Sequence, residues 1–196
     1  KKKNMFNLND ASFGGGATVF NNGNTGKVEN VKMSVTKKTA ADPDNSPDFK
    51  LIFTDTTGGQ INTGFYYHKD NEMADEKRNR DMETWLVSRV LSAAKAVVPA
   101  DFTFPEVTTS KEALNSLFKI INDNAASTLV NVYVTYGTTA KPSQYLSTRY
   151  FNFVENASTP ANMTRLKPSA NDMMEKLVAD APSTDNSAGT STTANW

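Results

Sequence analysis

The sequence predicts a mainly β fold with inserted helices, in the α+β class, and three observations favour it. Apolar and polar residues alternate with a period of two in several segments before residue 68, as they do in half-buried strands. Residues 73–98 and 109–121 instead repeat their apolar residues at helical spacing. The period of two then returns after residue 128. The expected order is therefore strands, helices and two further strands.

The first half of the chain supplies three or four of these strands. Residues 28–38 form the first clear one, because Val31, Met33 and Val35 share one side of an extended chain. The preceding residues 17–20 and the Asn/Gly-rich turn at 21–26 are expected to add a hairpin partner. Two prolines make a loop of residues 42–48. Further strands are predicted at 48–55 and 60–67, joined by a Gly-Gly turn.

The second half contains the helices and the last strands. Residues 73–98 contain neither Gly nor Pro and predict a long helix that ends at Pro99. A second helix opens at a capping box with Thr109 as N-cap and Glu112 at the third helical position. Strands are predicted at 129–136 and 144–155. Beyond them, Ser169 is expected to cap a short helix.

Composition excludes several function classes. The chain has 196 residues, 21 basic and 21 acidic side chains, one His and no Cys. It therefore lacks the ligands for Cys zinc sites or multi-His centres and the nucleophile for thiol catalysis. Its glycine clusters lack the spacing of phosphate-binding loops. No apolar run approaches the roughly 18 residues of a spanning helix. We expect a soluble, intracellular protein that is not an enzyme and has no metal, cofactor or membrane contact.

The order of the elements is that of an OB-fold, a five-stranded Greek-key barrel that binds single-stranded nucleic acid or sugars on one face. Here the helices fall between the third and fourth strands. We expect an OB-like nucleic-acid-binding domain over residues 1–156, with its helical insertion at 70–124. A short C-terminal extension with a helix follows over 157–180. Residues 181–196 are small and polar and predict a disordered tail.

Aromatic and basic residues are interleaved on the predicted strands. Single strands are held by bases stacked on aromatic rings and by cations that follow the phosphates. More than half of these aromatic residues are expected to fill the barrel core instead. The first 38 residues also hold seven lysines against two acids. The predicted nucleic-acid-binding residues are Lys32, Lys50, Phe65, Tyr67, Lys69, Tyr133, Tyr136, Lys141, Tyr145 and Arg149.

Several segments together resemble the single-stranded-DNA-binding proteins of tailed bacteriophages. They are residues 13–16 with 27–32, 47–55, 64–68, and 132–137 with 145–153. The resemblance covers about residues 6–155 and lies in the overall residue pattern of these segments and not in a diagnostic motif. It implies an OB-fold that coats single-stranded DNA during replication or recombination in the cytoplasm of the infected bacterial host. It also implies a flexible C-terminal tail that contacts replication enzymes.

Two further hypotheses concern Trp196, at the end of the tail, and the class of the protein. Trp196 follows a polar stretch, and we expect it to anchor the tail in a pocket of a replication partner. The alternative class is a structural or accessory protein of the virion without nucleic-acid binding, which Thr/Asn-rich strands and a balanced charge would also suit. The sequence leaves the oligomeric state, the base preference and the choice between DNA and RNA open.

Overall fold

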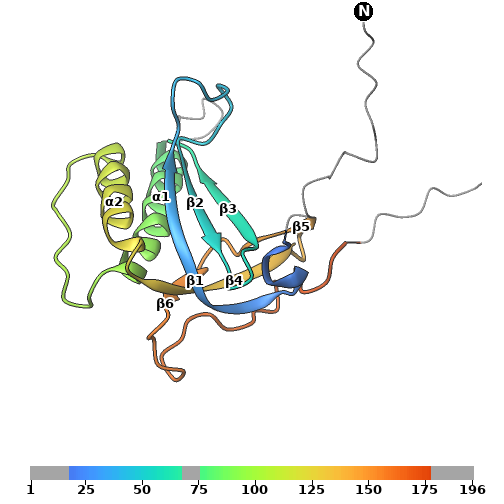
Figure 1. Cartoon of the computed structure of the whole chain (residues 1–196). Coiled ribbons are helices and arrows are strands. Elements are labelled where there is room, and N and C mark those ends of the chain that lie inside the picture. Colours follow the sequence, from blue (N-terminus) through green and yellow to red (C-terminus); the bar gives the residue numbers. More distant parts are fainter. Residues whose placement is uncertain (1–17, 68–75, 178–196) are drawn as a thin grey trace, which may run out of the picture.

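The computed structural model describes residues 18–67 and 76–177 (Figure 1), and this part of the chain has an α+β fold. Two helices separate the third strand from the fourth, as predicted, although there are six strands and not five. Neither helix in these residues has the length and apolarity to cross a membrane. The elements are η1 (Phe20–Gly23), β1 (Gly26–Lys37), β2 (Phe49–Thr54), β3 (Gln60–Phe65), α1 (Glu76–Val97), α2 (Ser110–Ala125), β4 (Leu129–Thr138), β5 (Lys141–Thr148) and β6 (Val154–Asn156).

All strands belong to one antiparallel sheet in the order β3-β2-β1-β4-β5, with β6 also paired to β4. β1 has two partners: its second half pairs with β2 and its first half pairs with β4. The register shifts between Val28 and Val31, where Asn30 has a φ of 57°. Such a bulge bends a strand and increases its twist. β1 consequently curves from one half of the sheet into the other (Figure 1).

This curvature brings the two outer strands of the sheet together. Thr63 on β3 and Thr148 on β5 are both buried, and their hydroxyl oxygens lie 2.5 Å apart. No backbone ladder joins β3 to β5 within residues 18–67 and 76–177. The sheet is therefore strongly curled but open along this seam.

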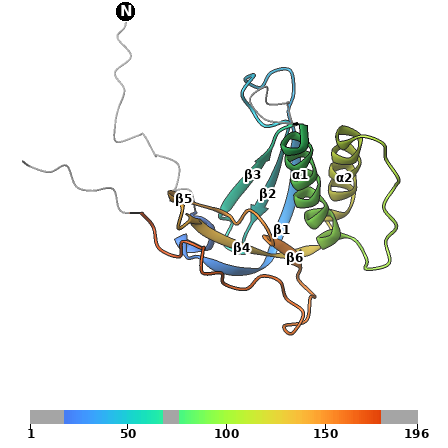
Figure 2. The same cartoon turned by 180° about the vertical axis from the view of Figure 1, so that it is seen from behind.

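The concave side of the sheet faces the helices and forms the core (Figure 2). Phe49, Leu51 and Phe53 alternate along β2 as predicted and are all buried. Phe118 of α2 stacks on Phe49 with ring centroids 3.9 Å apart. α1 contributes small residues, including Ala93 and Ala94, that allow a close approach. The described part of α1 begins at Glu76, so its predicted start lies outside the described residues.

The predicted capping box at the start of α2 is half correct. Thr109 Oγ1 accepts a hydrogen bond from the backbone N–H of Glu112, at 3.2 Å, as an N-cap side chain should. The Glu112 carboxylate, however, accepts from the backbone and the hydroxyl of Thr108, one residue earlier. These hydrogen bonds from Thr108 lower the pKa of Glu112. The helix start is thus fixed by both threonines.

The N-terminal hairpin predicted before β1 is wrong, since residues 20–23 form a 3-10 turn. Its first residue, Phe20, is 1% exposed and plugs one end of the core. A Cβ on Gly59 would lie 2.7 Å from the backbone of Phe20, so only glycine permits this contact. The alternation of apolar and polar residues at 17–20 was too short to distinguish a strand from a turn that buries one apolar side chain.

Two predictions near the C-terminus are also wrong. The strand predicted at 144–155 is broken, because the chain leaves the sheet between β5 and β6 at residues 149–153. The helix expected after Ser169 is absent from the described residues up to 177. Backbone groups of residues 171–173 instead bond to β4, including Tyr136 N–H to the Met173 carbonyl at 2.8 Å. β4 is free there because β1 begins only at Gly26, opposite Val134.

Asp55 ties the N-terminal plug to the turn between β2 and β3. Its carboxylate accepts hydrogen bonds from the backbone N–H groups of Asn21, Thr57 and Gly59 at 2.5, 2.8 and 2.9 Å. Burial by itself raises the pKa of Asp55, but these bonds and one from the Thr57 hydroxyl offset it, and the pKa is lowered overall. The charged form of Asp55 therefore stabilises the fold.

We predict that Asp55→Ala lowers the free energy of unfolding by about 2–4 kcal/mol, because three amides lose their acceptor. Urea unfolding measures this loss. The depressed pKa means that the contribution of the charge is complete above the unfolded pKa of about 3.9 and is lost as pH falls through the folded pKa. Asp42→Ala removes a similar turn carboxylate from an exposed loop and should cost much less. Equal losses for the two variants would contradict the assignment.

Candidate nucleic-acid interface

The convex side of β1, β2 and β3 is not covered by either helix. Three rows of residues cross these strands, and none of their members is buried. The only charged side chains among them are Lys32 and Lys50, and no carboxylate is present. We call this surface the β1–β3 face. It consists of Lys32, Thr54 and Gln60 in one row, Ser34, Ile52 and Asn62 in the next, and Thr36, Lys50 and Gly64 in the third.

An exposed aromatic ring lies at the end of this face. Tyr66 follows Gln60, Asn62 and Gly64 at intervals of two and is 53% exposed. A Cβ on Gly64 would lie 2.6 Å from Pro47 Cγ, so the bare glycine leaves room for the proline ring, while Tyr66 Cε2 would be at an ordinary contact distance of 3.9 Å. Lys50 is the register partner of Gly64. The face thus combines a cation and an accessible ring within neighbouring positions.

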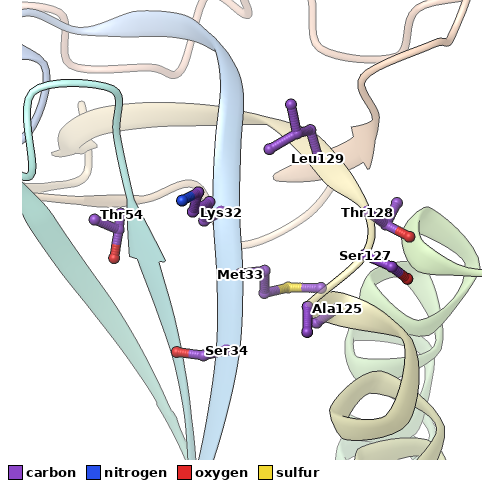
Figure 3. Close-up of a pocket in the computed structure, with 9 residues that line it drawn as sticks. Lys32, Met33, Ser34, Thr54, Ala125, Ser127, Thr128 and Leu129 are labelled. Carbon is purple, nitrogen blue, oxygen red and sulfur yellow. The ribbon is translucent and has the colours of Figure 1, made fainter.

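A groove of about 330 Å³ opens at the Lys32 end of the face (Figure 3). Lys32 and Leu129 form the last pair between β1 and β4, because β4 begins at Leu129, and the next residues of β1 lie beside the end of α2 and its loop to β4. Met33 extends across the gap toward Ala125 of α2, while Lys32 lies on the side of β2 (Figure 3). The groove is lined by Lys32, Met33, Ser34, Thr54, Ala125, Ala126, Ser127, Thr128 and Leu129. Its hydroxyls and ammonium group are suitable donors for a phosphate.

The structure places the predicted interface residues in different environments. Lys32 and Lys50 lie on the β1–β3 face, as predicted from their phase opposite the apolar residues. Lys141 and Tyr145 are exposed on β5, and Tyr145 is 79% exposed. Lys69 and Trp196 lie outside the described residues.

Four of the predicted aromatic residues serve the fold instead. Phe65 and Tyr133 are 2% and 1% exposed, so neither ring can stack on a base. The Tyr67 hydroxyl donates to Asn115 Oδ1 and the Tyr136 hydroxyl to the Gly23 carbonyl, both at 2.8 Å. Burial raises the pKa of both Tyr67 and Tyr133. The expectation that most such rings are structural is consistent with these positions.

Arg149 is also removed from the interface. Its guanidinium donates to the carbonyls of Phe151, Asn152, Arg165 and Lys167 and to the Asp172 carboxylate, at 2.7–3.4 Å. Only 12% of the side chain is exposed. Its guanidinium carbon lies 4.2 Å from the Tyr133 ring centroid, so it covers the convex side of β4. Three of these partners are 16–23 residues away in the sequence, which is why local patterning did not reveal them.

Sequence reasoning missed Tyr66, although a signal existed. The run Phe65-Tyr66-Tyr67 is aromatic throughout and shows no alternation by itself. The phase is set by the preceding Asn62 and Gly64, which point outward, and it assigns Tyr66 to the same side. The exposed ring of this run is therefore the middle one.

Comparisons with known proteins do not assign the chain to a family. No family model matches it, and neither a curated protein nor a solved structure is similar to it. Among the described residues, no group of three or more His, Asp or Glu side chains is placed to hold a metal ion. The functional argument accordingly depends on the geometry of the site.

We predict that Arg149→Lys lowers the free energy of unfolding by about 2–4 kcal/mol, because one ammonium group cannot replace a forked donor with several acceptors. Urea unfolding measures the loss, and limited proteolysis within residues 157–177 should become faster. Arg165→Lys, at an exposed side chain of the same segment, is the matched control and should be close to neutral. An unchanged stability for Arg149→Lys would show that this network is dispensable.

Proposed function

We propose that this chain binds single-stranded DNA, without sequence preference and without catalysis, on the β1–β3 face of an OB-like barrel. The role would be to coat DNA during phage replication or recombination, as the resemblance to phage single-stranded-DNA-binding proteins implies. Binding through the tail residue Trp196 to a replication enzyme remains a prediction of that resemblance.

The strand order supports the OB-like assignment. An OB-fold is a five-stranded, partly open Greek-key barrel. The order β3-β2-β1-β4-β5 places five strands side by side, and the contact between Thr63 and Thr148 brings the two outer strands, β3 and β5, together, as a barrel requires. Oligonucleotides bind OB-folds across strands 2 and 3. In this chain, that region is the uncovered β1–β3 face.

The observation that carries the proposal is the composition of this face. Its nine positions include two lysines, no acid and several hydrogen-bonding side chains, and Tyr66 adds an exposed ring beside Lys50. A single strand needs cations along its phosphates and rings on which bases stack, and such contacts tolerate any sequence. The groove beside Lys32 extends the row of donors beyond the edge of the strands.

A second candidate is an accessory protein of the virion that binds no nucleic acid. The loop between β1 and β2 favours it, because Asp42, Asp44 and Asp48 lie next to the face and repel phosphate. The Lys38 ammonium donates to the Asp44 carbonyl at 2.7 Å and offsets part of this charge. A fluorescent oligo(dT) titration at low salt separates the two candidates, since the accessory protein would give no shift.

We predict that the double variant Lys32→Gln/Lys50→Gln weakens oligo(dT) binding and reduces the slope of log K against log[salt] by about 1.4, or about 0.7 for each phosphate that is no longer neutralised. Fluorescence anisotropy at several salt concentrations measures both quantities. The matched control is Lys95→Gln/Lys119→Gln, which removes the same charge from exposed positions on α1 and α2. If both double variants change the slope equally, the lysines act only through net charge and not as a site.

We also predict that Tyr66→Ala weakens oligo(dT) binding by about tenfold, because stacking on one base contributes about 1–3 kcal/mol. Tyr66→Phe keeps the ring and loses only the hydroxyl, which makes a 3.4 Å contact to the Asn45 carbonyl. It should therefore bind like the unchanged protein. A loss of affinity in the Phe variant equal to that in the Ala variant would argue against stacking.

A further inference from the structure

Arg89, on α1, is a cation among aromatic rings. Its guanidinium carbon lies 4.9 Å from the ring centroid of Phe65, 4.5 Å from that of Tyr150 and 5.3 Å from that of Phe153. Nε of Arg89 is buried and has no hydrogen-bond partner, and within the described residues the side chain forms no ion pair. In this part of the chain, its charge therefore meets ring faces and no carboxylate.

Such an arrangement is unusual for arginine. The Arg89 side chain is partly buried, and charges that are removed from water are normally paired, because the loss of hydration without a counter-charge is unfavourable. Desolvation lowers the pKa of Arg89, yet a guanidinium stays protonated at any pH at which the protein is folded. Cation–π contacts offset only part of the desolvation. The unpaired positive charge is a place where an anion would be bound.

One of the three rings that contact this cation, Tyr150, is exposed and has an exposed aromatic neighbour. Tyr150 and Phe151 are 48% and 50% exposed and meet edge to face with centroids 4.6 Å apart. Trp85 is 53% exposed and precedes Arg89 by four residues, so it lies on the same face of α1. We call Trp85, Arg89, Tyr150 and Phe151 the Arg89 site.

The Arg89 site lies on the other side of β3 from the β1–β3 face. The Phe65 ring, which contacts Arg89, points into the core, whereas Tyr66, the next residue, points to the side of the face. The other wall of the site is the chain that leaves the sheet between β5 and β6, and β6 lies against α1 (Figure 2). Tyr150 comes two residues after Thr148, which contacts Thr63 of β3, so a DNA strand that crosses the face reaches the site by passing over the outer edge of β3 at this seam.

We propose that the Arg89 site is a second subsite for single-stranded DNA, in which Arg89 binds a phosphate and Tyr150 and Phe151 stack on bases. This inference rests on the proposed function and extends the path of the strand past Tyr66. A phosphate supplies the counter-charge that Arg89 lacks, and stacked bases cover rings that are otherwise in water. An acidic peptide would satisfy the cation equally but would leave no reason for exposed flat rings at its sides.

The test compares Arg89→Met in the full chain with unchanged protein, using fluorescent oligo(dT) of about 6 nucleotides, near the short end of the site sizes of OB-folds, and of about 20 nucleotides, above their long end of about 16. Methionine fills a similar volume without charge, so the melting temperature should be unchanged or higher. Affinity for the longer oligonucleotide should fall about three- to tenfold and its salt slope by about 0.7, the value for one phosphate contact. Affinity for the shorter one should not change. Lys95→Met, an exposed charge on the same helix, is the control.

Each outcome is decisive. If Arg89→Met keeps full affinity for the longer oligonucleotide, the subsite is wrong. The subsite is also wrong if the unchanged protein binds a poly-glutamate peptide at Arg89 more strongly than it binds oligo(dT) there. If neither length binds unchanged protein, the proposed function fails as well. If Arg89→Met does not fold, Tyr150→Ser/Phe151→Ser alters only exposed rings and gives the same readout. Photocross-linking of iodouracil-substituted oligonucleotide should label Trp85, Tyr150 or Phe151, and labels confined to the β1–β3 face would contradict the inference.

Discussion

The division of β1 between two partners is the constraint on which the other features depend. Its first half is hydrogen-bonded to β4 and its second half to β2, so the strand must bend between them, and the bulge at Asn30 supplies the bend. The bend curls the sheet until Thr63 meets Thr148. β4 begins at Leu129, opposite Lys32, so the groove beside Lys32 lies between the second half of β1 and the loop that joins α2 to β4.

The covering of the curled sheet decides which side chains can bind a ligand. α1 and α2 fill its concave side. On the convex side, Arg149 draws residues 151–172 across β4 and buries Tyr133. Among the described residues, the part formed by β1, β2 and β3 is left open and carries Lys32 and Lys50, and Lys141 and Tyr145 are exposed on β5. Arg149 therefore stabilises the fold through its hydrogen bonds, whereas Nε of Arg89 has no hydrogen-bond partner.

Sequence patterning predicted the parts of this fold that depend on neighbours in the chain. The strands of the first half and both helices follow from their apolar periods, and Lys32 and Lys50 were placed on the face by their phase. The break at 149–153 and the pairing of residues 171–173 with β4 were not predicted, because they depend on partners distant in sequence. The aromatic residues 65–67 were assigned in the wrong phase for a different reason. Phe65 and Tyr67 were predicted at the interface and Tyr66 was not, since three consecutive aromatic residues contain no alternation of polarity.

The seam between β3 and β5 has a consequence for the motions of the domain. A sheet closed by a continuous ladder opens only when many backbone hydrogen bonds break together, whereas this seam is bridged by one pair of hydroxyls within the described residues. Amide hydrogens along it should exchange with solvent through small local openings, while those of β2, which is paired with β1 and β3 along its whole length, should be released only by global unfolding. Local opening is therefore expected first at the seam, where the sheet can part while the ladders on both sides of β2 stay intact.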